Sequence, residues 1–160
     1  SNMALAITAL LISGFKLVEF NVQAAVNNTS LPGRMERIRE NLYMDGAHNQ
    51  ASVDALVETI KEKFPNKHIH FIVGILKDKD FDGILRKLED VASSFEFVNF
   101  QNERALRANI LYEHCNFSSK IITLDPCDVD FNQNSKNIIT IVTGSFYFIS
   151  KKKEKQGFSN

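Results

Sequence analysis

The stretch Leu42-Tyr43-Met44-Asp45-Gly46-Ala47-His48-Asn49 decides the fold class of this chain. It predicts an apolar strand that ends in a polar turn and then opens into a helix. The side chains of Asp45, His48 and Asn49 would then lie at the carboxyl edge of a sheet, where open α/β folds bind their ligands. The small residues between them would let phosphates or a ribose approach the backbone closely. The stretch therefore predicts a nucleotide-handling site.

Patterns downstream of this stretch alternate between apolar runs and amphipathic segments. Apolar residues spaced three and four apart predict helices, and short runs rich in β-branched and aromatic residues predict strands. The expected strands are residues 38–44, 68–74, 95–100, 120–124 and 138–144, and the expected helices are residues 50–64, 81–92 and 103–114. This alternation predicts an α/β fold with a Rossmann-like, mainly parallel sheet and helices on both faces. Residues 125–137 have poor periodicity and are expected to form an irregular loop.

Three of the expected strands end in residues that suit ligand binding. Asp45 and His48 follow the first strand, Gly74 with the charged run 77–80 follows the second, and Thr143-Gly144-Ser145 closes the last. Because the carboxyl ends of parallel strands meet at one edge of a sheet, we expect the three groups to converge there.

Each of these motifs also has an ordinary structural interpretation. Asp45 could accept hydrogen bonds within a tight turn while His48 or Asn49 caps the following helix. The run 77–80 could be a solvated loop whose acids favour a helix N-terminus, and Ser145 alone could be a turn hydroxyl.

Two histidines, His68 and His70, alternate along an expected strand. No third ligand stands at a recognisable metal spacing, so we interpret them as a strand-surface and a core histidine, not as a metal site.

The composition argues against several classes of function. With 160 residues and 44% hydrophobic content, the chain can bury one core. Nineteen Lys plus Arg balance nineteen Asp plus Glu, which argues against nucleic-acid binding because that needs a basic surface. Cys115 and Cys127 match no metal-ligand spacing and indicate a reducing, cytoplasmic location. The sequence contains neither a Gly-x-Ser-x-Gly nucleophile elbow nor a Gly-x-x-x-x-Gly-Lys-Ser/Thr loop for ATP phosphates.

The N-terminal run from Met3 to Phe15 is apolar but has no basic flank, and it is shorter than the roughly 18 residues of a membrane span. We therefore expect an amphipathic helix and no membrane partner. A polar, turn-rich linker at residues 27–33 marks the one expected domain boundary. The Lys-rich end, residues 151–160, is expected to be a solvated tail.

The chain resembles the C-terminal half of folylpolyglutamate synthase and of its dihydrofolate synthase relative, in the Mur ligase superfamily. The matching motifs are Leu31-Pro32-Gly33-Arg34-Met35-Glu36, Asp45-Gly46-Ala47-His48-Asn49, Gly74 with Asp78-Lys79-Asp80, and Thr143-Gly144-Ser145-Phe146-Tyr147. The resemblance covers about residues 3–149. The chain departs from the family at Gln50, where proline is frequent, and at residues 125–137, where a helix is expected before the last strand.

The resemblance implies an ATP-dependent ligase that joins L-glutamate to the γ-carboxyl of a folate through an acyl phosphate, with folate or dihydropteroate as partner. It assigns residues 1–30 to the last helices of a central ATPase domain plus linker, residues 31–150 to the glutamate- and nucleotide-binding domain, and residues 151–160 to a polar tail. The P-loop domain and the ligands of Mg²⁺ would lie outside these 160 residues. We therefore expect a fragment that is inactive alone.

The resemblance also implies roles for single residues. Arg34 and His48 would be catalytic, both lying against the ATP phosphates as the domains close. Asp45 would bind the ribose hydroxyls, and Asn2 would contact the adenine.

By analogy with related Mur ligases, Lys79 and Ser145 would hold the carboxylate of the incoming glutamate. The alternative is a stand-alone, non-catalytic α/β module that binds a nucleotide or an amino acid. An exposed apolar face along the N-terminal helix would favour the ligase, because such a face fits a neighbouring domain better than solvent.

Overall fold

A computed structural model of the chain describes residues 12, 34–131 and 135–145. The chain divides into two compact units, residues 1–31 and 32–160. The linker, the polar tail and all of the expected N-terminal helix except residue 12 lie outside the described residues. Among the residues that are described, no helix is long and apolar enough to cross a membrane.

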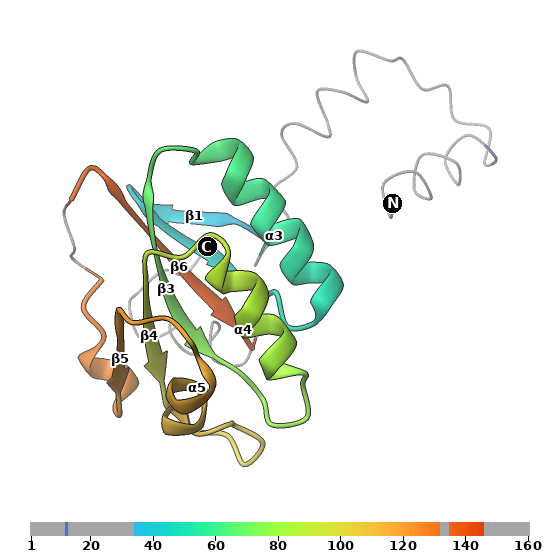
Figure 1. Ribbon diagram of the computed structural model, residues 1–160, viewed down its shortest axis with the longest axis vertical. Coiled ribbons are helices and arrows are strands. Elements are labelled where there is room, and N and C mark those ends of the chain that lie inside the picture. Colours follow the sequence, from blue (N-terminus) through green and yellow to red (C-terminus); the bar gives the residue numbers. More distant parts are fainter. Residues whose placement is uncertain (1–11, 13–33, 132–134, 146–160) are drawn as a thin grey trace. The chain divides into compact units, whose positions relative to one another are not determined.

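The described part is built on a six-stranded sheet with the order β1-β2-β6-β3-β4-β5 (Figure 1). The strands are β1 (Glu36–Arg39), β2 (Leu42–Asp45), β3 (His68–Gly74), β4 (Ser94–Val98), β5 (Lys120–Thr123) and β6 (Ile138–Gly144). Every neighbouring pair is parallel except β1 with β2. The prediction of an α/β fold with a mainly parallel sheet is confirmed.

The helices are α3 (Gln50–Lys63), α4 (Phe81–Glu89) and α5 (Ala108–His114), and Pro126–Asp128 form one turn of 3-10 helix, η1. The buried residues of α3 include Val53, Leu56 and Ile60, so the three-and-four spacing does mark its core face. The helix ends at Lys63, two residues before Pro65, because the residue before a proline disfavours helical backbone.

Two segments differ from the elements expected at these positions. Residues 38–44 are not one strand: β1 and β2 form an antiparallel hairpin that turns at Asn41, whose φ of 59° is a left-handed conformation that asparagine tolerates. Residues 103–107 are not helical either. The Leu106 N–H donates to the Ile75 carbonyl and the Ala108 N–H to Asn99 Oδ1, and these bonds hold the segment against β3 and β4 until α5 begins.

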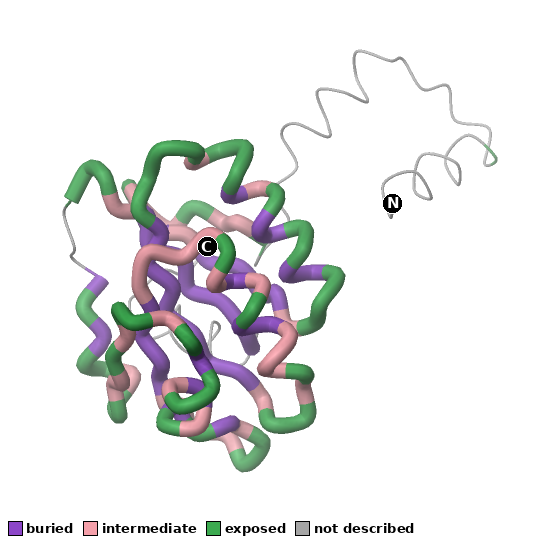
Figure 2. Tube along the Cα trace, viewed as in Figure 1, coloured by how far each residue is buried: buried purple, intermediate pink, exposed green. Residues whose placement is uncertain are grey.

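The three helices contribute to one core cluster, which they form with the facing side chains of β3, β4 and β6. In Figure 1 the helices lie on the near side of the sheet, and Figure 2 shows the buried strands behind them. The other cluster joins Leu42, Met44 and Ile72 to Val129 and Phe131. Within residues 34–131 and 135–145, this second face is thus covered by an irregular segment, where helices on both faces were expected.

The strand order explains this division. The chain moves from β3 through β4 to β5 in one direction and returns from β5 to β6 in the other. Because crossovers between parallel strands are right-handed, a connection running the opposite way must cross the opposite face. The expected irregular loop after Leu124 is therefore the cover of the second core.

The expected placement of the two histidines, one at the strand surface and one in the core, is confirmed. His68 is exposed at the start of β3. His70 is buried, and its Nδ1 lies 2.7 Å from Ser94 Oγ.

Candidate functional site

The carboxyl ends of three adjacent strands form the candidate site. Strand β6 lies between β2 and β3, so that Thr143 is aligned with Asp45 on one side and with Val73 on the other. Gly74 is aligned with Gly144 one position further along. The expected convergence of the three strand ends is confirmed, and it lies at the centre of the sheet.

Asp45 carries a buried carboxylate that joins two backbone segments. Its Oδ2 accepts the Met35 N–H at 2.8 Å, and its Oδ1 accepts the Ala47 N–H at 2.8 Å. Burial raises the pKa of this carboxyl above its ordinary value, while the two N–H donors and the charge of Arg34 act in the opposite direction. The turn role considered for Asp45 is therefore present in the structure, and the same contacts place the exposed Arg34 near the carboxylate.

His48 and Asn49 form the turn that leads into α3. Asn49 is the N-cap: its side chain accepts the Ser52 N–H at 2.9 Å, and Ser52 Oγ accepts the Asn49 N–H, which makes a reciprocal capping box. His48 Nδ1 lies 2.7 Å from the Gly46 carbonyl oxygen. Because a carbonyl can only accept, Nδ1 carries a proton, and Nε2 can donate a hydrogen bond only when it is protonated as well.

Two glycines bring β6 and β3 unusually close at this edge. Gly144 has a φ of 119°, and a Cβ there would overlap the carbonyl oxygen of Gly74. The same carbonyl accepts the Ser145 N–H at 2.8 Å. The buried Ser145 is thereby held beside the end of β3.

Lys79 lies in the loop between β3 and α4. Its Nζ is 3.6 Å from Asp78 Oδ2, which also accepts a hydrogen bond from Arg104 at 2.7 Å. The Arg104 bond holds the pKa of Asp78 below its ordinary value. Sequence reasoning missed Arg104, which belongs to the segment that replaces the start of the expected third helix.

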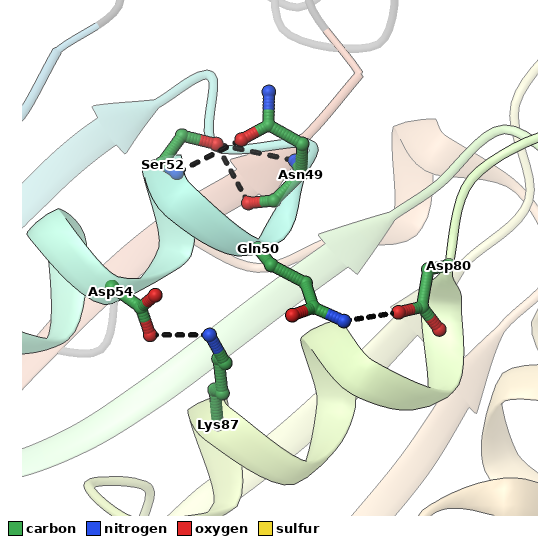
Figure 3. A network of polar contacts seen from close by, with 6 residues as sticks. All are labelled: Asn49, Gln50, Ser52, Asp54, Asp80 and Lys87. Carbon is green, nitrogen blue, oxygen red and sulfur yellow. Dashed lines mark hydrogen bonds and ion pairs between the residues drawn. The ribbon is translucent and has the colours of Figure 1, made fainter.

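A polar network ties the beginning of α3 to α4 (Figure 3). Gln50 donates a hydrogen bond to Asp80, and Lys87 pairs with Asp54. The bond from Gln50 and a second one from the Gly83 N–H lower the pKa of Asp80, which caps α4. Figure 3 shows the Gln50 side chain extending from α3 to Asp80. The sequence showed only that Gln50 stands where the family frequently has proline, and it did not indicate this contact.

One polar atom at this edge is buried without a hydrogen-bond partner. The Thr143 hydroxyl oxygen is unsatisfied, on a residue that is 1% exposed. It stands next to Asp45 in the sheet register. An orphaned hydroxyl beside a carboxylate, with a guanidinium near it, suits a ligand that combines hydroxyl groups with negative charge.

The structure does not reach every predicted site residue. Asn2 lies outside the described residues, so its expected adenine contact stays a prediction. Among the residues described, no group of three His, Cys, Asp or Glu side chains is placed to hold a metal ion.

Comparison with known proteins identifies the domain. The family described as Mur ligase, glutamate ligase domain, matches residues 33–143. A dihydrofolate synthase/folylpolyglutamate synthase of Bacillus subtilis is 40% identical over 124 residues, which are 74% of this chain and 29% of that protein.

Solved structures agree with this assignment. Escherichia coli FolC in complex with DHPP and ADP superposes with a TM-score of 0.84 at 25% identity, over 98% of this chain and 39% of FolC. A bifunctional folylpolyglutamate synthase/dihydrofolate synthase with Mn, AMPPNP and L-glutamate bound gives 0.76 at 25% identity, over 95% of this chain and 38% of that one.

The chain thus spans less than two fifths of the length of these relatives. The matched residues include the ends of all three strands at the candidate site, as far as Thr143 on β6. The family resemblance that the motifs indicated is confirmed. The chain belongs to the glutamate ligase domain family of the Mur ligases.

Proposed function

We propose that this chain forms the nucleotide- and glutamate-binding half of an ATP-dependent ligase that joins L-glutamate to the γ-carboxyl of a folate. The observation that carries the proposal is the meeting of Asp45, Thr143 and Gly74 at one sheet edge, within a domain matched by the glutamate ligase family. Relatives named dihydrofolate synthase/folylpolyglutamate synthase support folate or dihydropteroate as the acceptor.

Three residues are proposed to bind ATP. Arg34 would donate parallel hydrogen bonds to phosphate oxygens and neutralise charge that builds up as the phosphoryl group moves. Asp45 would accept hydrogen bonds from the ribose hydroxyls. His48, whose ring is oriented by the Gly46 carbonyl, would lie against the terminal phosphates and donate to them from a protonated Nε2. A proposed fourth contact, from Asn2 to the adenine, lies outside the described residues.

Two residues are proposed to hold the incoming amino acid. Lys79 and Ser145 follow the neighbouring strands β3 and β6, and their ammonium and hydroxyl groups suit a carboxylate. For Lys79 to do so, it must leave Asp78, from which its Nζ is 3.6 Å away. The Arg104 bond to the same Asp78 oxygen would remain and would keep that acid paired.

In the proposed reaction the folate carboxylate attacks the γ-phosphorus of ATP and ADP leaves. The amine of glutamate then displaces phosphate from the acyl phosphate and forms the amide. Arg34 and His48 would stabilise phosphate charge and help to exclude water, while Lys79 and Ser145 would orient the incoming glutamate. Mg²⁺ would neutralise phosphate charge, with ligands that we propose lie on the P-loop domain. We place the ligase in the cytoplasm; the thiols of Cys115 and Cys127, which form no disulfide, are compatible with that location.

Titration calorimetry of ATP with Mg²⁺, and then of glutamate, into this chain tests the proposal. His48→Ala should weaken ATP binding at least about tenfold, because a hydrogen bond to a charged group contributes about 1.5–3 kcal/mol. His68→Ala is the matched control, since His68 lies at the opposite end of β3 and should not change the Kd. Equal effects of the two substitutions, or no ATP binding by the folded parent chain, would contradict the proposal.

A further inference from the structure

The backbone next to Arg34 adopts a conformation that needs support. Met35 has a φ of 40°, in the left-handed region, which costs a residue other than glycine roughly 1–2 kcal/mol. Its side chain packs against the core cluster on the helix side of the sheet. Its N–H donates to Asp45 Oδ2 at 2.8 Å. The residue is therefore anchored both by its side chain and by its amide.

Asp45 is a firm anchor for this amide. The residue is 3% exposed and lies at the end of β2, which pairs with β1 on one side and β6 on the other. Its second oxygen is fixed by the Ala47 N–H. One carboxylate thus joins residue 35 to the turn that carries His48.

We propose that Asp45 is a positioning residue for Arg34: by holding the Met35 amide in a left-handed turn, it sets the direction from which the guanidinium approaches the ATP phosphates. The proposal rests on the proposed function for the identity of the ligand. It goes further by giving Asp45 a second role, which acts on the phosphate end of the nucleotide through the backbone.

The two roles of Asp45 are compatible. Each carboxylate oxygen has two lone-pair sites, and each uses one of them for a backbone N–H. The remaining sites can accept ribose hydroxyls without releasing Met35. Ribose and phosphate recognition would then share one rigid group, and loss of the carboxylate would weaken the binding of both parts of the nucleotide.

Amide hydrogen exchange tests the anchor without any ligand. In Asp45→Ala both backbone donors lose their acceptor, so we expect the Met35 amide to exchange at least about tenfold faster than in the parent chain. The amide of Phe71, in the middle of β3, reports global unfolding and should change far less. Glu58→Gln, on the exposed side of α3, is the control for a lost carboxylate. An unchanged Met35 amide would overturn the proposal.

A second variant keeps this test decisive if Asp45→Ala does not fold. Met35→Gly retains the amide donor and removes the cost of the positive φ. Asp45→Ala in the Met35→Gly background should therefore fold more readily than Asp45→Ala alone. It should also show fast exchange at residue 35. Slow exchange there would contradict the anchor.

Ribose-modified nucleotides separate the two roles of Asp45. With 2′,3′-dideoxy-ATP and Mg²⁺ as the calorimetric probe, the ribose contact is absent, and Asp45→Ala should still weaken binding at least about fivefold if Asp45 acts through Arg34. The double variant Asp45→Ala/Arg34→Ala should then bind no more weakly than Arg34→Ala alone. Unchanged dideoxy-ATP binding in Asp45→Ala, or additive effects in the double variant, would overturn the positioning role. Failure of the parent chain to bind either nucleotide would overturn the proposed function. The exchange experiment would still show whether Asp45 holds the Met35 amide.

Discussion

Asp45 places a carboxylate inside the protein, and this affects stability as well as binding. Its raised pKa means that the folded state binds a proton more readily than the unfolded state. Stability from this group is therefore fully present below the unfolded value of 3.8 and is lost as the pH rises through the folded pKa. The sign is opposite to that of a surface carboxylate held by an ion pair.

We therefore expect the free energy of unfolding of the parent chain, relative to Asp45→Asn, to increase as the pH falls through the raised pKa toward 3.8. Urea unfolding at a series of pH values measures this difference, with Glu58→Gln as the control for an exposed acid. A parent-minus-variant difference that decreases on acidification would show that the N–H donors outweigh burial.

Gly144 is the second position where a single atom decides the local structure. Gly144→Ala should lower the free energy of unfolding by at least about 2 kcal/mol, because it combines a glycine-only φ with a clash against the Gly74 backbone. Gly83→Ala is the matched control, since the atoms nearest to its new methyl group belong to the Asp80 and Gln50 side chains and not to the backbone. Thermal unfolding compares the two, and an equal loss in both would argue against the tight β6–β3 approach.

The sequence allowed the site residues to be placed at one edge, but not their hydrogen bonds. Strand alternation and the parallel arrangement were enough to bring Asp45, Gly74 and Thr143 together. The Met35–Asp45 bond spans ten residues and depends on a hairpin that was expected to be a single strand. The orphaned Thr143 hydroxyl likewise follows from packing that no local pattern records.

At the scale of the elements, the N-cap residue Asn49 determines where α3 begins. Asn49→Ala removes the side-chain acceptor for the Ser52 N–H and should lower the free energy of unfolding by about 1 kcal/mol. Asn49→Asp keeps an acceptor and should retain most of that stability. Chemical denaturation of the two variants measures the difference. Equal destabilisation by alanine and aspartate would contradict the capping role.

The strands and helices whose bounds were predicted best are those whose buried residues recur in a regular pattern. The bounds of β3 and β6 agree with the expected residues 68–74 and 138–144, because both are central strands with continuous apolar runs. The expected helix at 103–114 was too long at its start, since bonds from Leu106 and Ala108 to distant partners replace helical ones. Such tertiary competition leaves no periodic signal.

At the scale of the whole molecule, these 160 residues contain no P-loop sequence. We therefore expect this chain alone to catalyse no ATP-dependent incorporation of labelled glutamate into folate or dihydropteroate. The assay measures label in the folate fraction with and without ATP. ATP-dependent labelling by the chain alone would show that its own residues bind and activate the phosphates, and would overturn the division of labour proposed above.

The position of β6 determines when the sheet can be completed. The strand that ends at Gly144 is the last to be synthesised of the six, yet it separates β2 from β3. Until it leaves the ribosome, two apolar strands have unpaired edges, and such edges favour aggregation. Translation that stops before Ile138 would thus leave two partial sheets with nothing to join them, and the three strand ends of the site could not meet. Chaperone binding to nascent chains of this domain should therefore persist until the final strand has emerged.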